Sequence, residues 1–219
     1  MAQEVPDTER VVRSPWPRGV AGIVAGIVTG SFAAWAYYDD VFRPLAHSFG
    51  LWITLVALLS AGQRSRRAMT QSCAALAAAV IAFYVGKKVM YGIDHPGMPY
   101  SINVSVLTEW LILAVVAGVA LGWAFSWSGR PGRFGALGTA AVVGLLVADA
   151  YRRAHNFRTE AAVLVAFTVL AVVAVLCATV RSRSQLALVA GFAVPCALVG
   201  FVLVSAPDLL EQLLITGSF

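Results

Sequence analysis

Long apolar segments alternate with short polar segments along the whole chain. About 20 helical residues, at about 1.5 Å each, cross a hydrocarbon layer about 30 Å thick. The period-two alternation of a half-buried strand is absent, and so is a glycine-rich nucleotide loop. The pattern therefore predicts an all-α polytopic bundle of seven transmembrane helices, at 19–38, 45–62, 68–91, 104–127, 134–150, 160–180 and 185–204.

Polar segments flank this predicted transmembrane domain, which covers residues 19–206. Residues 1–18 hold acidic and basic side chains and are expected to form a cytoplasmic tail. At the other end, residues 207–219 place leucines against Asp208, Glu211 and Gln212. That spacing favours a short helix lying in the membrane interface.

The distribution of lysine and arginine predicts the orientation, because cytoplasmic loops carry an excess of both. With seven spans and the N-terminus inside, ten of these residues fall on the cytoplasmic side and six outside. The second span is short, and without it the count becomes eight on each side. The charges thus favour seven spans, N-in and C-out, with these cytoplasmic residues: Arg10, Arg13, Arg18, Arg64, Arg66, Arg67, Arg130, Arg133, Arg181 and Arg183.

The composition excludes a soluble domain and narrows the partners. The 219 residues are 59% hydrophobic and 12% charged, against about 25% charged in soluble domains. The net charge of +5 comes from clusters between apolar runs, which is the pattern of membrane loops rather than of nucleic-acid binding. A bias toward Arg, Ala, Val and Gly indicates a GC-rich bacterial genome, so we expect a multi-pass protein of the bacterial cytoplasmic membrane.

The first predicted span carries small residues every fourth position, at Gly22, Gly26, Gly30 and Ala34. Residues four apart share one helix face, and small side chains there let a second helix approach closely. The neighbour can be another span of the same chain, a second copy or a partner subunit. This face is similar to the small-residue motif in the first span of the substrate-binding subunits of energy-coupling-factor transporters, although those proteins usually have six spans.

Several ionisable side chains are predicted near the outer membrane surface. Glu109 lies about one turn inside its span, Asp149 lies near the end of its own, and Tyr84, Lys88 and Tyr91 share one helix face. Ionisable groups in a membrane are costly and usually face the bundle interior in pairs. They therefore predict either snorkelling lysines with a structural ion pair or an outward-facing pocket for a ligand.

A basic and aromatic run follows Asp149 and, with His95 and Trp110, is expected to rim the outer surface, where an anionic group such as a lipid phosphate could bind. Together these patterns give the predicted ligand-binding residues: Tyr84, Lys87, Lys88, Tyr91, Glu109, Trp110, Asp149 and Arg152.

No metal or cofactor is expected. Cys73, Cys177 and Cys196 all fall inside apolar runs, where a cysteine behaves as a small buried residue. The three histidines lack metal-ligand spacing. Signatures of intramembrane proteolysis, prenyl transfer and retinal binding are also missing, so the sequence does not favour an enzyme.

The chain resembles uncharacterised small polytopic families of GC-rich bacteria. The resemblance rests on the spacing of Trp110, Gly118, Gly122 and Trp123, and on the segment 144–150, Gly-Leu-Leu-Val-Ala-Asp-Ala. Such families carry no established activity. Three hypotheses therefore remain open: a module that binds or moves a small solute or lipid, a structural subunit of a larger complex docked through the first span, and an enzyme acting on lipid at the outer face.

Overall fold

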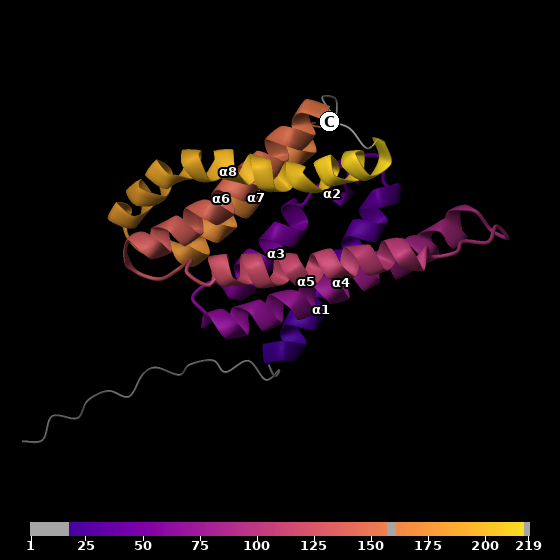
Figure 1. Ribbon diagram of the computed structural model, residues 1–219, viewed down its shortest axis with the longest axis horizontal. Helices are drawn as coiled ribbons and strands as arrows, with labels where there is room; N and C mark the ends of the chain where they lie inside the picture. The colour runs from indigo at the N-terminus through magenta and orange to yellow at the C-terminus, as the bar shows by residue number, and fades with distance from the viewer. Residues whose placement is uncertain (1–17, 157–160, 217–219) are drawn as a thin grey trace, which may run out of the picture.

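Eight α-helices and no strand are formed by the residues that the computed structural model describes, which are 18–156 and 161–216 for the backbone, with side chains at 19–154 and 161–206. Six of them are long and apolar enough to cross a membrane. The helices are α1 (Arg18–Tyr38), α2 (Arg43–Ala46), α3 (Gly50–Ser60), α4 (Ser65–Asp94), α5 (Val104–Phe125), α6 (Gly132–Asn156), α7 (Ala161–Thr179) and α8 (Arg183–Thr216) (Figure 1).

The second predicted span is interrupted. It consists of the short helix α2 and the eleven-residue helix α3, separated by His47, Ser48 and Phe49. Pro44 lies in the first turn of α2, where a missing amide hydrogen costs nothing. Ser48 then accepts a hydrogen bond from the Gly50 amide at 2.9 Å, which satisfies one amide at the start of α3.

Two other boundaries differ from the prediction. The basic segment expected as a loop after Asp149 continues α6 as far as Asn156. The C-terminal segment expected as a separate interfacial helix continues α8 through Pro207 to Thr216. The first 17 residues lie outside the described part of the chain, and so does Arg158, at the end of the basic run that was expected to rim the outer surface. The side chains of His155, Asp208 and Glu211 are also outside it.

Helices α1 and α4 run in the same direction, because Gly22 faces Gln71, Gly26 faces Ala75 and Gly30 faces Ala79. The chain must therefore return from one end of the bundle to the other between them, and it does so through α2 and α3. Helices α6 and α8 are likewise parallel, with Val189 packed on Ala136 and Ala140 at one end and Phe201 near Tyr151 at the other. Helix α5 runs antiparallel to α4, since Gly118 and Gly122 face Cys73 and Met69.

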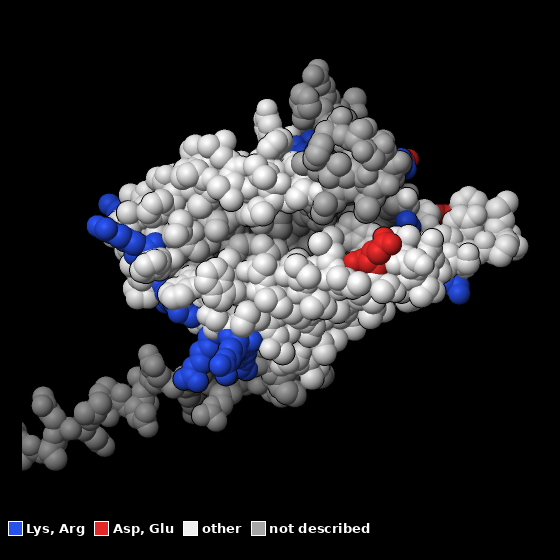
Figure 2. All heavy atoms as spheres, in the orientation of Figure 1, with Lys and Arg blue, Asp and Glu red and all other residues white. Residues whose placement is uncertain are grey.

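Helix α3 is short, but it lies at the centre of the bundle. Helix α3 contacts α1, α2, α4, α5, α6 and α7, and Ile53, Leu55, Val56 and Ala57 lie in the main hydrophobic core. In contrast, α5, α7 and α8 expose most of their apolar side chains. Figure 2 shows these flanks almost free of charged side chains, as a lipid-facing surface requires.

Candidate functional site

The two ends of the bundle differ in chemistry. One end, which we call the arginine-rich end, holds the start of α1 and the turns between α3 and α4, α5 and α6, and α7 and α8. The other, the tyrosine-rich end, holds Tyr37, Tyr38, Tyr84, Tyr91 and Tyr100. The predicted ligand-binding residues all belong to the tyrosine-rich half.

Asp149 is the centre of a buried polar cluster in that half. Only 1% of it is exposed. Its Oδ2 accepts hydrogen bonds from the Ser48 hydroxyl at 2.8 Å and from the Gly50 amide at 3.1 Å. The carboxylate of α6 therefore meets the first turn of α3, where the helix dipole favours a negative charge.

Arg152 completes the cluster from the next turn of α6. Its Nη2 lies 3.4 Å from Asp149 Oδ1, and its guanidinium lies 5.3 Å from the ring centre of Phe49. Both partners of this ion pair are buried, with 7% and 1% of their side chains exposed. Removing either partner of such a buried ion pair strongly destabilises the fold, because the other charge stays buried. The cluster of Ser48, Gly50, Asp149 and Arg152, here named the helix-break cluster, thus ties α6 to the interruption between α2 and α3.

Lys87 occupies a second, aromatic site at the tyrosine-rich end. Its Nζ lies 3.7 Å from the ring centre of Tyr37 and 5.5 Å from that of Phe83. The Tyr38 hydroxyl donates to the Lys87 carbonyl oxygen at 3.3 Å. These contacts join α1 to α4, so the lysine contributes a cation–π interaction to that helix pair.

The remaining predicted residues lie around the α4–α5 hairpin, which projects beyond the rest of the bundle (Figure 1). Tyr91 stacks on His95 with ring centres 4.6 Å apart and lies 5.1 Å from Tyr100. Tyr84 is half-buried, Lys88 and Glu109 are exposed, and Trp110 is 39% exposed.

The depths of Lys88, Glu109 and Asp149 in their spans predict that these three side chains converge near the outer surface, and this convergence is not found. Asp149 is fully buried on Ser48 and Arg152, whereas Lys88 and Glu109 are on the surface. No ion pair or hydrogen bond between these three side chains occurs in the described part of the chain. The prediction missed Ser48 because it lies 101 residues from Asp149. The nearest signal in the sequence was the polar Ser48 beside His47 within an otherwise apolar span.

The small-residue face of α1 is occupied by α4. A Cβ added to Gly26 or Gly30 would overlap the backbone of Ala75 or Ala79, and a Cβ on Gly86 would lie 2.6 Å from that of Ala34. Because helix backbone fills this face, a partner helix has no access to it. Small residues serve the same purpose between α4 and α5 at Gly118, and between α6 and α8 at Gly144.

The arginine-rich end is held together by hydrogen bonds to backbone carbonyl oxygens of its turns. The Gly62 amide, at a φ of 68°, donates to the Ser128 carbonyl at 2.7 Å, and Arg130 Nη2 donates to the Gln63 carbonyl at 2.8 Å. Gln185 Nε2 donates in turn to the Arg130 carbonyl at 3.2 Å. These bonds link the turns that precede α4, α6 and α8.

No group of three or more potential metal ligands occurs among the described residues. No curated protein and no solved structure matches this chain. A family model does match, over nearly the whole length of the transmembrane bundle and across both ends described above. Residues 9–210 fit it, so the chain belongs to the family of unknown function DUF6518.

Proposed function

We propose that this chain is a non-enzymatic membrane module that binds a small solute or lipid from its outer face and helps to move it across the bilayer. The observation that carries the proposal is the helix-break cluster, in which a buried carboxylate and a buried guanidinium meet an interrupted helix. Ionisable groups inside a membrane bundle commonly mark solute or ion pathways, and interrupted helices commonly supply binding sites in transporters.

The arrangement of the helices supports this proposal. Helices α1, α3 and α4 form one set of three, and α6, α7 and α8 form another, with α5 as the connection. In both sets the first and last helices are parallel. Two helix sets with parallel outer helices are also the arrangement of transporters that are built from parallel repeats. Since α3 of the first set contacts α6 of the second at the helix-break cluster, a movement of one set against the other would open that cluster.

Seven crossings with the N-terminus inside a bacterial cytoplasmic membrane are part of the proposal. Six long apolar helices and the parallel course of α1 and α4 support that count. The tyrosine-rich end is then the outer face. Tyr84, Lys87, Lys88, Tyr91, Glu109 and Trp110 are proposed to contact the ligand as it approaches Asp149 and Arg152.

The alternatives have less support. A structural subunit docked through the first span would need the small-residue face of α1, but α4 covers it. A lipid-modifying enzyme needs an acid and a base within hydrogen-bond reach of each other beside a cavity. The helix-break cluster pairs its acid with an arginine, which does not act as a base at physiological pH.

The test is the access of water to Ser48. In a variant with the three native cysteines replaced by alanine, Ser48→Cys is introduced and the protein is reconstituted in vesicles. A membrane-impermeant thiol reagent is then added to the outer face. We expect Ser48→Cys, buried at 3% exposure in this structure, to be labelled as the cluster opens. A panel of small solutes and lipids is screened for those that slow the labelling, and these are the candidate ligands.

The matched control is Ser60→Cys. Ser60 is also buried, at 0% exposure, and hydrogen-bonds Ser72 in the half of the bundle nearer the arginine-rich end. It should resist the same reagent. If Ser48→Cys is labelled no faster than Ser60→Cys, the helix-break cluster is static packing and the proposed function is wrong.

A further inference from the structure

Two hollows lie at the arginine-rich end, one at the start of each parallel helix pair. The first has a volume of about 410 Å³ and lies between Gly19 of α1 and Arg66, Arg67, Thr70 and Gln71 of α4. The second has a volume of about 390 Å³ and lies between Gly132 of α6 and Arg181, Ser182, Ser184 and Gln185 of the α7–α8 turn and α8. Both are large enough for a phosphate-sized group.

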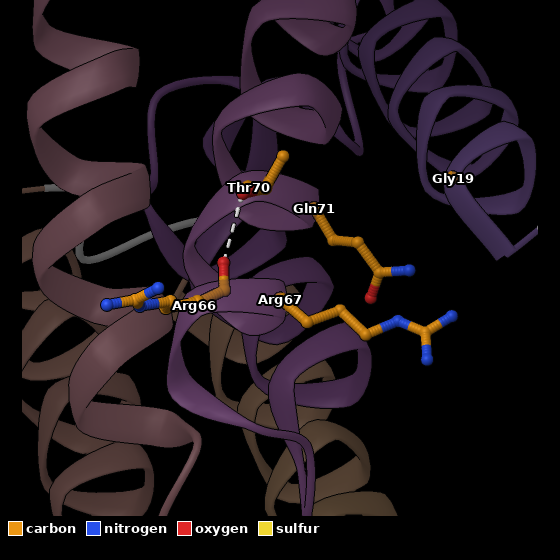
Figure 3. A pocket seen from close by; sticks show the side chains of 5 residues that line it. All are labelled: Gly19, Arg66, Arg67, Thr70 and Gln71. Carbon is orange, nitrogen blue, oxygen red and sulfur yellow. Dashed lines mark hydrogen bonds between the residues drawn. The ribbon is translucent and has the colours of Figure 1, made fainter.

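The linings of the two hollows match in chemistry. Each has an exposed arginine, at least one hydroxyl group and a glutamine that is 8% exposed. Figure 3 shows Arg67 and Gln71 extending from α4 toward the side where Gly19 begins α1, while Thr70 bonds the Arg66 carbonyl oxygen at 3.0 Å. In the second hollow, Gln185 Oε1 accepts from the Arg181 amide at 3.2 Å and fixes the backbone that carries this arginine.

The charge around both hollows has one sign. Figure 2 shows basic side chains gathered at this end of the bundle. None of the acidic side chains that the structure describes lies there, because Asp39, Asp40, Asp94, Glu109 and Asp149 all belong to the tyrosine-rich half. Arginine guanidinium groups bind phosphate through short, charge-assisted hydrogen bonds. An anionic phosphate ester is the ligand class that this lining fits.

Exposed apolar side chains follow each hollow along the chain. Val20 and Ile23 lie next along α1 from Gly19 and are 38% and 42% exposed. Leu186 and Leu188 follow Arg181 along α8 and are 46% and 36% exposed. A ligand with a charged head and apolar tails would therefore satisfy both surfaces at once.

We propose that the two hollows are headgroup sites for anionic phospholipid in the leaflet at the arginine-rich end, with one lipid between α1 and α4 and a second between α6 and α8. Each lipid places its phosphate against Arg67 or Arg181 and its acyl chains along α1 or α8. This assignment is independent of the proposed transport function, since it requires only that the bundle spans a bilayer. Free phosphate shares the headgroup chemistry but has nothing to cover the apolar flank.

The experiment compares lipids on the purified full-length protein in detergent. Native mass spectrometry measures how much phosphatidylglycerol stays bound, compared with phosphatidylcholine that has the same acyl chains. Thermal unfolding measures how far each lipid, and inorganic phosphate, raises the unfolding temperature. We expect phosphatidylglycerol to remain bound and to raise the unfolding temperature more than the other two. In Arg67→Gln/Arg181→Gln, its affinity should fall roughly tenfold, as expected for losing a charged hydrogen bond at each site.

The control is Arg64→Gln/Arg133→Gln, which removes two exposed arginines from the same end but from neither hollow. It should bind phosphatidylglycerol like the unmodified protein. An equal loss in both double variants would overturn the proposal, because diffuse charge would then explain the binding. Stabilisation by inorganic phosphate equal to that by phosphatidylglycerol would also overturn it, in favour of a soluble phosphate compound. Because the substituted arginines are exposed, both variants should keep the monodisperse elution of the unmodified protein.

Discussion

Asp149 shows how one buried residue can hold two distant segments together. Its carboxylate caps the first turn of α3 and pairs with Arg152 on its own helix. Removing the charge breaks the ion pair with Arg152, and removing the side chain also breaks the hydrogen bonds from the Ser48 hydroxyl and the Gly50 amide. The two kinds of substitution therefore separate the charge from the hydrogen bonds.

We expect Asp149→Ala to lower the free energy of unfolding by about 3–5 kcal/mol, the usual cost of breaking a buried pair. Asp149→Asn should cost less, because its amide oxygen still accepts hydrogen bonds from Ser48 and Gly50. Thermal unfolding in detergent measures both. The control is Asp40→Asn, since Asp40 pairs with Arg43 at 2.7 Å but its side chain is 92% exposed, and exposed pairs contribute little. A change at Asp40 as large as that at Asp149 would contradict the role assigned to burial.

The same asparagine substitution should also affect access to the helix-break cluster. Without the carboxylate charge, α6 holds the start of α3 less tightly, and we expect Ser48→Cys to be labelled faster in the Asp149→Asn background. Hydrogen bonds to a neutral amide are weaker than those to a carboxylate, and a loss of about 1–3 kcal/mol of stabilisation corresponds to roughly a 5–150-fold rise in the open population. The labelling rate with the impermeant reagent measures this. An unchanged rate would show that Asp149 does not hold the cluster closed.

At the scale of helices, α1 and α4 pack backbone against backbone only over part of their length. Gly26 and Gly30 allow no added Cβ, whereas a Cβ at Gly22 would lie an ordinary 3.7 Å from the Gln71 carbonyl oxygen. We expect Gly26→Ala to force the helices apart and cost about 1–3 kcal/mol. Gly22→Ala should be neutral or slightly stabilising, because alanine favours the helix. Equal unfolding temperatures for the two variants would contradict the close contact at Gly26.

The helices that consist of one long apolar run could be predicted from the sequence. The long apolar runs located α1, α4, α5, α7 and the membrane part of α8 to within a few residues. The interruption of the second span was not predicted, because His47 and Ser48 look like ordinary flanking residues until the contact with Asp149 is known. The extension of α6 was missed for a related reason, since Arg152 and its neighbours resemble a solvated basic loop in sequence.

The candidate site was predictable only in part. The tyrosine-rich half was indicated by the depth of Asp149, Lys87 and Glu109 in their spans, and the burial of Asp149 agrees with the rule that membrane charges face inward. The partners were not predictable, because sequence spacing relates residues within one helix and says nothing of contacts between helices far apart in the chain. Ser48 and Phe49 could be assigned to Asp149 and Arg152 only from the packing of α3 on α6.

At the scale of the whole molecule, the order of the helices explains the separation of chemistry between the two ends. Both parallel pairs, α1 with α4 and α6 with α8, begin at the arginine-rich end. Helix N-termini carry partial positive charge and add to the arginines there. The opposite end gathers the tyrosines and the described acidic side chains. This asymmetry separates the proposed lipid sites at one end from the proposed solute entry at the other.

The orientation of the bundle in the membrane gives the last prediction. The α3–α4, α5–α6 and α7–α8 turns meet at the arginine-rich end, and arginine-rich loops stay in the cytoplasm. A reporter that is active only in the cytoplasm should therefore be active when fused after Gln63, Arg130 or Arg183. Fusions after Gly97 in the α4–α5 hairpin and after Phe219 should be silent. If α2 and α3 enter and leave the membrane on the same side, every later segment is inverted, so the fusion after Phe219 becomes active. Activity there would rule out seven crossings with the N-terminus in the cytoplasm.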